Sequence, residues 1–336
     1  MNALGASTAI VGTTTWGTTL ALTLARRGLP VLLLARSPAE AARLEASREH
    51  GARLPGQRFP PSMRVTADAT TLADAAMVVF AVPSQTLRRN ARELAPRIPR
   101  GAVVISACKG LEQATAKRMS VVLREELGGA NPICALSGPN LAHEIVLGLP
   151  ASTVVASADD SAALRAQALI NSNTLRVYTN SDVVGTELGG ALKNIISIGA
   201  GICDGLRLGD NAKAGFVGRG LAEITRLGVA AGAHPLTFAG LAGLGDLIAT
   251  CYSALSRNHR VGAALARGLT LQQALNELGG EVAEGVSTTP AALDLAKALG
   301  VEMPITETTR RVLFEGLGVR DAIAELMGRA PKPEHA

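Results

Sequence analysis

The sequence predicts an α/β protein whose N-terminal domain contains a mostly parallel sheet and whose C-terminal domain is all-α. Three observations support this prediction. Short β-branched runs alternate with helical stretches through the first half of the 336 residues, as in parallel strands joined by helices. Some runs, such as 76–82, are continuously apolar, which is typical of strands buried on both faces. After about Asp182 the strand pattern ends and only helical patterns follow.

In chain order, the elements follow from these patterns. The expected strands are Thr8–Val11, Val31–Leu34, Met77–Ala81, Val103–Ser106, Ile133–Leu136, Ser152–Ala156 and Leu175–Tyr178. The expected helices of the first half are Gly17–Arg27, Pro38–His50, Ser84–Leu94 and Ala114–Leu127. Those of the second half are Thr186–Gly201, Lys213–Gly228, Leu236–Thr250, His259–Ala266, Leu271–Leu278, Thr288–Leu299 and Ile305–Glu315.

We therefore expect a sheet domain over 1–185, a helical domain over 186–330 and a short disordered tail over 331–336. Hydrophobic residues make up 47% of the chain and aromatic residues only 2%, so both cores must be aliphatic. The net charge is +5, but lysine and arginine are scattered rather than clustered. This distribution argues against nucleic-acid binding and fits attraction of small anionic metabolites.

The sequence also argues against a secreted or membrane protein. The uncharged stretches 1–25 and 227–245 are interrupted by glycines, and the first lacks the basic start of a signal peptide. Four cysteines show no paired spacing, which predicts reduced thiols and no metal site: Cys108, Cys134, Cys203 and Cys251. We expect a cytoplasmic protein without membrane insertion.

A nucleotide-binding signature lies where the first strand meets the first helix. Gly12 is placed for the tight turn and Gly17 for close packing of helix and strand, as in a Rossmann-like dinucleotide-binding fold. Thr14 replaces the glycine that normally lets the backbone approach the pyrophosphate. Arg36, at the end of the second strand, suits the 2′-phosphate of NADPH better than the ribose hydroxyls of NADH.

Two lysines are candidates for carbonyl chemistry. Lys193 lies on an otherwise apolar helix after Gly189-Gly190, where burial can lower its pKa and the glycines can admit substrate. Lys109 follows a strand and can supply a second cation that polarises the carbonyl. Asp246 is a candidate to orient Lys193, with Thr250 one helical turn further on.

Ser256, Arg257 and Asn258 form a compact set of phosphate donors, although the same run could simply begin a helix. A dehydrogenase that uses histidine is the rival mechanism, but only His143 lies in a candidate site run. The combination indicates hydride transfer to a small phosphorylated carbonyl compound.

The chain resembles the bacterial NAD(P)-dependent glycerol-3-phosphate dehydrogenases over essentially its whole length. The matching runs are 80–85 (FAVPSQ), 109–112 (KGLE), 136–140 (LSGPN), 187–194 (ELGGALKN), 205–211 (GLRLGDN), 240–247 (GLAGLGDL), 256–258 (SRN) and 301–305 (VEMPI). The resemblance implies reversible reduction of dihydroxyacetone phosphate to sn-glycerol 3-phosphate for phospholipid synthesis, with NADPH or NADH, by a homodimer packed through its helical domain.

Carried onto matching positions, the resemblance makes Lys193 the acid/base residue. It implies substrate contacts from Lys109, Gly138, Asn140, Lys193, Asp246, Ser256, Arg257 and Asn258. It implies cofactor contacts from Thr15, Trp16, Arg36, Lys109, Ala142, Arg257, Val282 and Glu284, beside Gly12 and Gly17 of the turn. Thr13-Thr14-Thr15 and Gly218 depart from the family pattern, which bears on cofactor affinity more than on the reaction.

Two alternatives stay open at this point. The chain could reduce another small phosphorylated or carboxylated ketone. Of these two classes, the phosphate donors at 256–258 favour a phosphorylated substrate. It could also be a non-catalytic dinucleotide-binding regulator, a possibility raised by Thr14 and weakened by the retained Lys193, Lys109 and Asp246.

Overall fold

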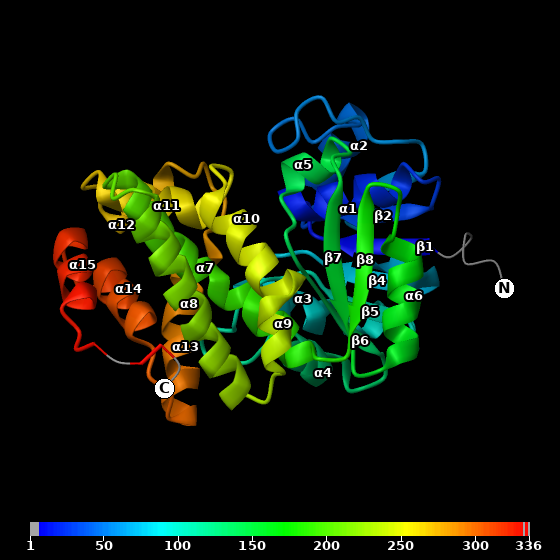
Figure 1. Cartoon of the computed structure of the whole chain (residues 1–336). Coiled ribbons are helices and arrows are strands. Elements are labelled where there is room, and N and C mark those ends of the chain that lie inside the picture. The colour runs from blue at the N-terminus through cyan, green and yellow to red at the C-terminus, as the bar shows by residue number, and fades with distance from the viewer. Residues whose placement is uncertain (1–6, 332, 335–336) are drawn as a thin grey trace.

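The computed structural model describes residues 7–331, 333 and 334 of the chain. A sheet flanked by helices and a cluster of helices lie side by side (Figure 1). The expected disorder of the tail 331–336 falls partly on residues 332, 335 and 336, which lie outside the described residues. Within the described residues, no helix is both long enough and apolar enough to cross a bilayer.

Within the described part of the chain, eight strands form a single sheet in the order β3-β2-β1-β4-β5-β6-β7-β8. All neighbouring pairs are parallel except β6 and β7, which are antiparallel. The strands are β1 (Ser7–Val11), β2 (Val31–Leu34), β3 (Met63–Thr66), β4 (Ala75–Phe80), β5 (Val103–Ser106), β6 (Ile133–Ser137), β7 (Ala151–Ala156) and β8 (Leu175–Asn180). The mostly parallel sheet and its seven expected strands are confirmed.

Strand β3 was not predicted from the sequence. It is short, lies at the edge of the sheet, and alternates buried Met63 and Val65 with exposed Arg64. An edge strand needs only one apolar face, so it lacks the continuous apolar run that marks the central strands.

Helices cover both faces of the sheet and build the rest of the chain. In the sheet domain they are α1 (Thr15–Ala25), α2 (Pro38–Ser47), η2 (Ala69–Asp74), η3 (Ser84–Thr86), α3 (Leu87–Leu94), η4 (Ala95–Arg97), α4 (Met119–Leu127), α5 (Ala142–Val146) and α6 (Asp160–Ile170). Beyond it are α7 (Val183–Gly205), α8 (Asp210–Ala230), α9 (Pro235–Ala239), η5 (Leu241–Gly245), α10 (Asp246–Tyr252), α11 (Arg257–Ala266), α12 (Leu271–Asn276), α13 (Glu284–Leu299), α14 (Pro304–Phe314) and α15 (Val319–Met327). The helices α5, α6 and α15 were not predicted.

The strand order reverses at β1: β2 and β3 are added on one side of it, and β4 and the later strands on the other. In open parallel sheets ligands bind outside the carboxyl ends of the strands at such a point. Here Gly12 has φ +109°, and a Cβ on it would lie 2.8 Å from the Ala81 carbonyl oxygen. A Cβ on Gly17 would lie 2.1 Å from the Gly12 carbonyl oxygen, so only glycine allows α1 to start this close to β1.

The helix α7 is the centre of the helical part and is buried along most of its 23 residues. It begins three residues after β8 ends, so the proposed domain boundary near 185 falls in its first turn. Glu187 of α7 accepts hydrogen bonds from Arg118 (2.6 Å) and from the backbone N–H (2.7 Å) and hydroxyl (2.6 Å) of Ser120. These bonds fix α7 to the start of α4 in the sheet domain.

Candidate active site

Lys193 lies in the middle of α7 and is only 5% exposed. Its Nζ donates to the Oδ1 atom of Asp246 and to the hydroxyl of Thr250 (2.5 Å). The Thr250 hydroxyl donates to the Asp246 backbone carbonyl (2.6 Å), so its oxygen is free to accept from the lysine. An ammonium has three N–H donors, so this arrangement leaves one for a substrate oxygen.

Lys109, three residues beyond β5, reaches the same carboxylate from the sheet domain. Its Nζ donates to Oδ2 of Asp246 (2.7 Å) and to the Gly138 carbonyl oxygen (2.7 Å). Asp246, which is 1% exposed, therefore binds one lysine with each oxygen. Two ammonium groups share one carboxylate, and the site retains a net positive charge that suits a developing alkoxide.

Burial lowers the pKa of Lys193 to about 8, since an ammonium loses hydration inside the protein. The Asp246 carboxylate opposes this shift, and the like charge of Lys109 adds to it. A lysine with this pKa can give up a proton near neutral pH, which an ordinary lysine does poorly.

A π-helical turn brings Asp246 to the two lysines. The sequence predicts one helix over Leu236–Thr250, but this prediction is wrong: α9 ends at Ala239, η5 is a π-helical turn, and α10 begins at Asp246. Gly240 is extended (φ −90°, ψ −163°), which stops α9. Such wide turns often occur at functional sites, where they redirect one side chain.

The glycines before Lys193 allow close packing of the protein itself. A Cβ on Gly189 would lie 2.6 Å from the Ala242 carbonyl oxygen, and one on Gly190 would lie 2.3 Å from the Ser137 hydroxyl. The expectation that they admit substrate is therefore wrong. They let η5 and the end of β6 approach α7, which brings Asp246 and Lys109 within reach of Lys193.

The run 256–258 begins α11, which packs along α7. Ser256 caps the helix by accepting from the His259 N–H, and its hydroxyl also lies 3.0 Å from that of Ser197. Asn258 donates to the side-chain oxygen of Asn194 (2.9 Å). Ser197 lies one helical turn beyond Lys193, so its contact with Ser256 places the start of α11 near the face of α7 that carries the lysine. Sequence reasoning missed Asn194 and Ser197, and only Ser197 could have been suggested by its spacing, because it lies at i+4 from Lys193.

Gly138 and Asn140 lie just beyond β6, beside Lys109. Gly138 has φ +136°, and Asn140 donates to the Thr153 hydroxyl (3.1 Å). The amide oxygen of Asn140 and the hydroxyl of Ser137 are buried without a hydrogen-bond partner in the described residues. Buried polar groups are normally satisfied, so these atoms indicate a place for a polar ligand.

In the turn between β1 and α1, the side chain of Thr14 points into the protein. Its hydroxyl donates to the Ala81 carbonyl (2.7 Å) and accepts from the Gly17 N–H (3.0 Å), which caps α1. Its φ of −65° is an ordinary value for a non-glycine residue. The threonine side chain is therefore held away from the outer side of the turn.

Arg36 and Glu40 lie beyond the carboxyl end of β2. The Arg36 side chain is 88% exposed, and its Nε is 3.4 Å from Oε2 of Glu40. The other oxygen of Glu40 accepts from Thr13 (2.8 Å). His50, which sequence reasoning missed, lies behind the turn with Nε2 3.1 Å from the Thr13 carbonyl oxygen. Arg36 is thus available to an incoming anion.

The remaining residues that were predicted to bind the cofactor come from several other elements. Ala142 begins α5, and its carbonyl lies 3.4 Å from the Thr19 hydroxyl of α1. Glu284 begins α13 and accepts from the Ser84 N–H (3.0 Å) and hydroxyl (2.5 Å). Burial raises the pKa of the Glu284 carboxyl, and the Ser84 bonds oppose that shift. Val282 and Arg257 are exposed, as is His143 on α5.

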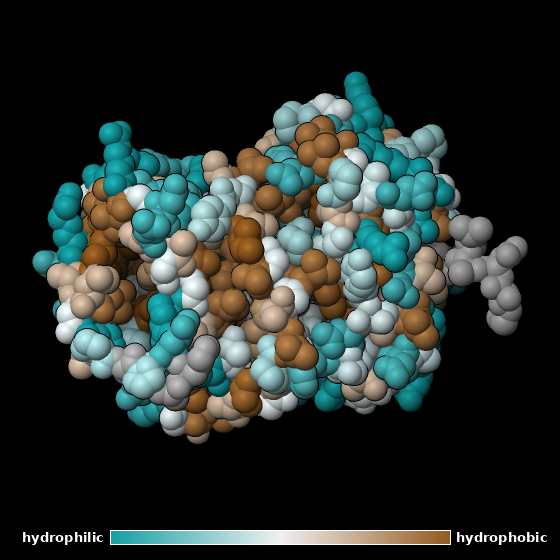
Figure 2. All heavy atoms as spheres, viewed as in Figure 1, coloured by the Kyte–Doolittle hydropathy of each residue, from teal (hydrophilic) through white to brown (hydrophobic). Residues whose placement is uncertain are grey.

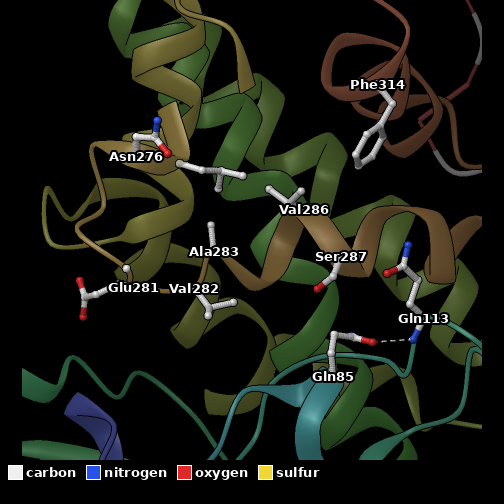
Figure 3. Close-up of a pocket in the computed structure, with 11 residues that line it drawn as sticks. Gln85, Gln113, Asn276, Glu281, Val282, Ala283, Val286, Ser287 and Phe314 are labelled. Atoms are coloured by element: carbon white, nitrogen blue, oxygen red, sulfur yellow. Dashed lines mark hydrogen bonds between the residues drawn. The ribbon is translucent and has the colours of Figure 1, made fainter. Parts of the chain in front are cut away.

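A cavity of about 720 Å³ opens next to these elements. It lies between Gln85 and Gln113 of the sheet domain and the loop that joins α12 to α13 (Figure 3). Within the described part of the chain, no three metal-type ligands come together.

Comparison with known proteins adds independent information. Residues 7–163 match the model of the N-terminus of NAD-dependent glycerol-3-phosphate dehydrogenase, and residues 182–324 match that of its C-terminus. The chain is 50% identical to a glycerol-3-phosphate dehydrogenase [NAD(P)+] of Dehalococcoides mccartyi over 322 residues, 95% of this chain and 89% of that one.

A second relative is the glycerol-3-phosphate dehydrogenase [NAD(P)+] of Streptomyces coelicolor, which is 48% identical over 328 residues, 97% of each chain. The crystal structure of glycerol-3-phosphate dehydrogenase from Coxiella burnetii superposes with a TM-score of 0.93 at 34% identity. That match covers 97% of this chain and all of the other.

Proposed function

This chain belongs to the NAD-dependent glycerol-3-phosphate dehydrogenase family, and on that premise we propose that it reduces dihydroxyacetone phosphate reversibly to sn-glycerol 3-phosphate. It is an NAD(P)-dependent oxidoreductase that serves phospholipid synthesis. The observation that carries the proposal is the buried pair of lysines held by one carboxylate, Lys193 and Lys109 on Asp246.

Lys193 acts as the general acid in this proposal. The reduced nicotinamide, when bound, supplies a hydride to the C2 carbonyl carbon. The carbonyl oxygen then gains negative charge, and the third N–H of Lys193 is free to give it a proton. Asp246 and Thr250 hold the other two N–H groups, so the ammonium cannot rotate away from the substrate.

Lys109 stabilises the same oxygen electrostatically. Its ammonium is fixed by Asp246 and the Gly138 carbonyl, so no reorganisation is needed as charge develops. In the reverse reaction Lys193, as the neutral amine, takes the alcohol proton. Asp246 is a positioning group for both lysines.

Ser256, Arg257 and Asn258 bind the substrate phosphate in this scheme. Ser256 and Asn258 are buried against α7, whereas Arg257 is exposed and free to turn toward an anion. A phosphate bound at a distance from the reacting carbon supplies binding energy that positions the carbonyl against Lys193. Asn140 and Ser137 offer further polar atoms beside Lys109.

The residues around the first turn fit a dinucleotide. The start of α1 presents N–H groups and a partial positive charge that suit a pyrophosphate, and the Thr14 side chain does not obstruct them. Thr15 and Trp16 begin α1, and Ala142 begins α5, which contacts α1 through Thr19. Exposed Arg36 supports NADPH as the preferred cofactor, because its guanidinium can pair with the 2′-phosphate that NADH lacks.

Initial rates of dihydroxyacetone phosphate reduction with NADPH and with NADH, at matched concentrations, test the proposal. Turnover that favours NADPH supports both the reaction and the role of Arg36. No turnover with either nucleotide in folded protein contradicts it. Activity restricted to a different phosphorylated ketone would transfer the proposal to that substrate, and binding without turnover would favour a regulator.

We also propose a homodimer that forms through the helical part. Large exposed hydrophobic side chains support it, among them Leu236 (71% exposed), Ile248 (47%) and Tyr252 (50%). Hydrophobic residues gather across the middle of the face shown in Figure 2. Molar mass from light scattering tests this proposal.

A cytoplasmic location is supported by the four cysteines, all of which are free.

A further inference from the structure

Glu281 crosses from the helical part to the start of α1. It lies in the loop between α12 and α13, and its Oε1 accepts a hydrogen bond from the Thr15 hydroxyl (3.0 Å). The same oxygen is 3.6 Å from Nη1 of Arg53. In Figure 3 its carboxylate points away from Val286 and Phe314 on the other side of the cavity. One carboxylate thus binds the first residue of α1.

This carboxylate occupies a position that suits a phosphate. Thr15 is the first residue of an 11-residue helix, whose N-terminus carries partial positive charge and free N–H groups. Dinucleotide pyrophosphates bind at this end of the first helix in Rossmann-like folds. A carboxylate oxygen and a phosphate oxygen cannot both accept from the one Thr15 proton, and their like charges repel.

The loop that carries Glu281 is anchored in the core at its two ends. Gly279 (φ +61°) and Gly280 (φ +82°) precede it in left-handed conformations, which glycine adopts without strain. Leu278 and Ala283 are buried and anchor its two ends. Between these anchors the loop borders the 720 Å³ cavity rather than packed core, so moving Glu281 off α1 breaks no core contact.

We propose that Glu281 competes with the phosphates of the cofactor for the N-terminus of α1, and that this competition lowers the affinity for NADPH. The inference rests on the proposed function, because it assumes that a dinucleotide binds at α1. Binding of NADPH displaces Glu281, which in turn frees Arg53 to pair with a phosphate. The apparent Kd equals the intrinsic Kd divided by the fraction of molecules in which Glu281 does not hold Thr15.

The variant Glu281→Gln tests the proposal because it removes the charge and keeps the size. Trp16, the only tryptophan of the chain, follows Thr15 directly, so its fluorescence reports NADPH binding without turnover. If Glu281 engages about four-fifths of the free molecules, the variant binds NADPH about fivefold more tightly. The gain shrinks at high ionic strength, since salt screens partly exposed charges.

Glu277→Gln is the matched control. It makes the same charge change four residues earlier, at an exposed residue that pairs with Arg267 and not with α1. We expect its Kd for NADPH to equal that of the wild type. If Glu281→Gln binds NADPH with the same Kd as the wild type, the inference is overturned. Weaker binding by the variant would also overturn it, because Glu281 would then stabilise the bound cofactor.

The same experiment separates the two proposals. Turnover of dihydroxyacetone phosphate by the wild type, together with equal Kd values, would leave the proposed function intact and refute only the role of Glu281. Absence of NADPH binding in wild type and variant alike would refute both.

Discussion

Replacing Asp246 with asparagine should shift the pH dependence of the reaction. Burial brings the pKa of Lys193 from 10.5 to about 8, which corresponds to about 3 kcal/mol against the ammonium form. Asp246 is the main group that opposes this shift. Loss of a hydrogen-bonded opposite charge typically changes a pKa by about 1–3 units, so the variant should have a Lys193 pKa clearly below that of the wild type.

The direction follows from the role of Lys193. Ketone reduction needs the ammonium form, so the wild-type rate should fall as pH rises through about 8. Alcohol oxidation needs the amine, and its rate should rise across the same range. A lower pKa reduces the ammonium fraction at pH 7, so reduction by the variant should slow by about twofold or more from this cause alone.

The assay is the pH profile of kcat for dihydroxyacetone phosphate reduction in wild type and Asp246→Asn, followed by loss of NADPH absorbance. Thermal unfolding of both proteins controls for loss of structure. If the fall in rate stays near pH 8 in the variant, Lys193 is not the group that titrates and the reasoning is refuted. A wild-type profile without a transition near pH 8 would refute it equally.

Three further substitutions test separate parts of the site. Lys193→Ala should retain substrate binding and lose most turnover, so a near-normal kcat would contradict the proposed mechanism. Arg36→Ala should lower kcat/KM for NADPH by about 10- to 100-fold, the value of a charge-assisted contact, and leave NADH unchanged; equal losses with both would argue against 2′-phosphate recognition. Thr14→Gly should cost about 1 kcal/mol of unfolding free energy, because it removes the hydrogen bond to the Ala81 carbonyl and leaves α1 with a weaker glycine cap, without tightening NADPH binding; clearly tighter binding would show that the side chain obstructs the pyrophosphate.

Stability outside the site offers one more test in the same set. Glu223→Ala should lower Tm by several degrees with unchanged KM, because the buried Glu223 carboxylate accepts three hydrogen bonds at the start of α14 (2.8 Å each). An unchanged Tm would mean that water satisfies these donors equally well.

The prediction of the sheet succeeded where burial is complete. Strands such as β4 and β5 are covered on both faces, so their residues must be apolar without interruption and the sequence shows it. It failed at β3, where one face is exposed, and at Gly240, where a helical pattern of hydrophobic residues hides a break in the backbone. Periodicity reports which face is buried and says little about where a helix is interrupted.

The sequence by itself determined which groups are present: a lysine on an apolar helix, a second lysine after a strand, an aspartate among glycines and a cluster of phosphate donors. Their runs are specific enough to predict the family. Only the tertiary structure decided that Asp246 binds both lysines, which lie 53 and 137 residues away from it in sequence. It also decided that Gly189 and Gly190 admit protein rather than substrate, and that Glu281 meets Thr15 across 266 residues. Local sequence encodes propensity and burial, whereas such contacts depend on how whole elements pack, and that packing is set by the sum of many weak interactions along the chain.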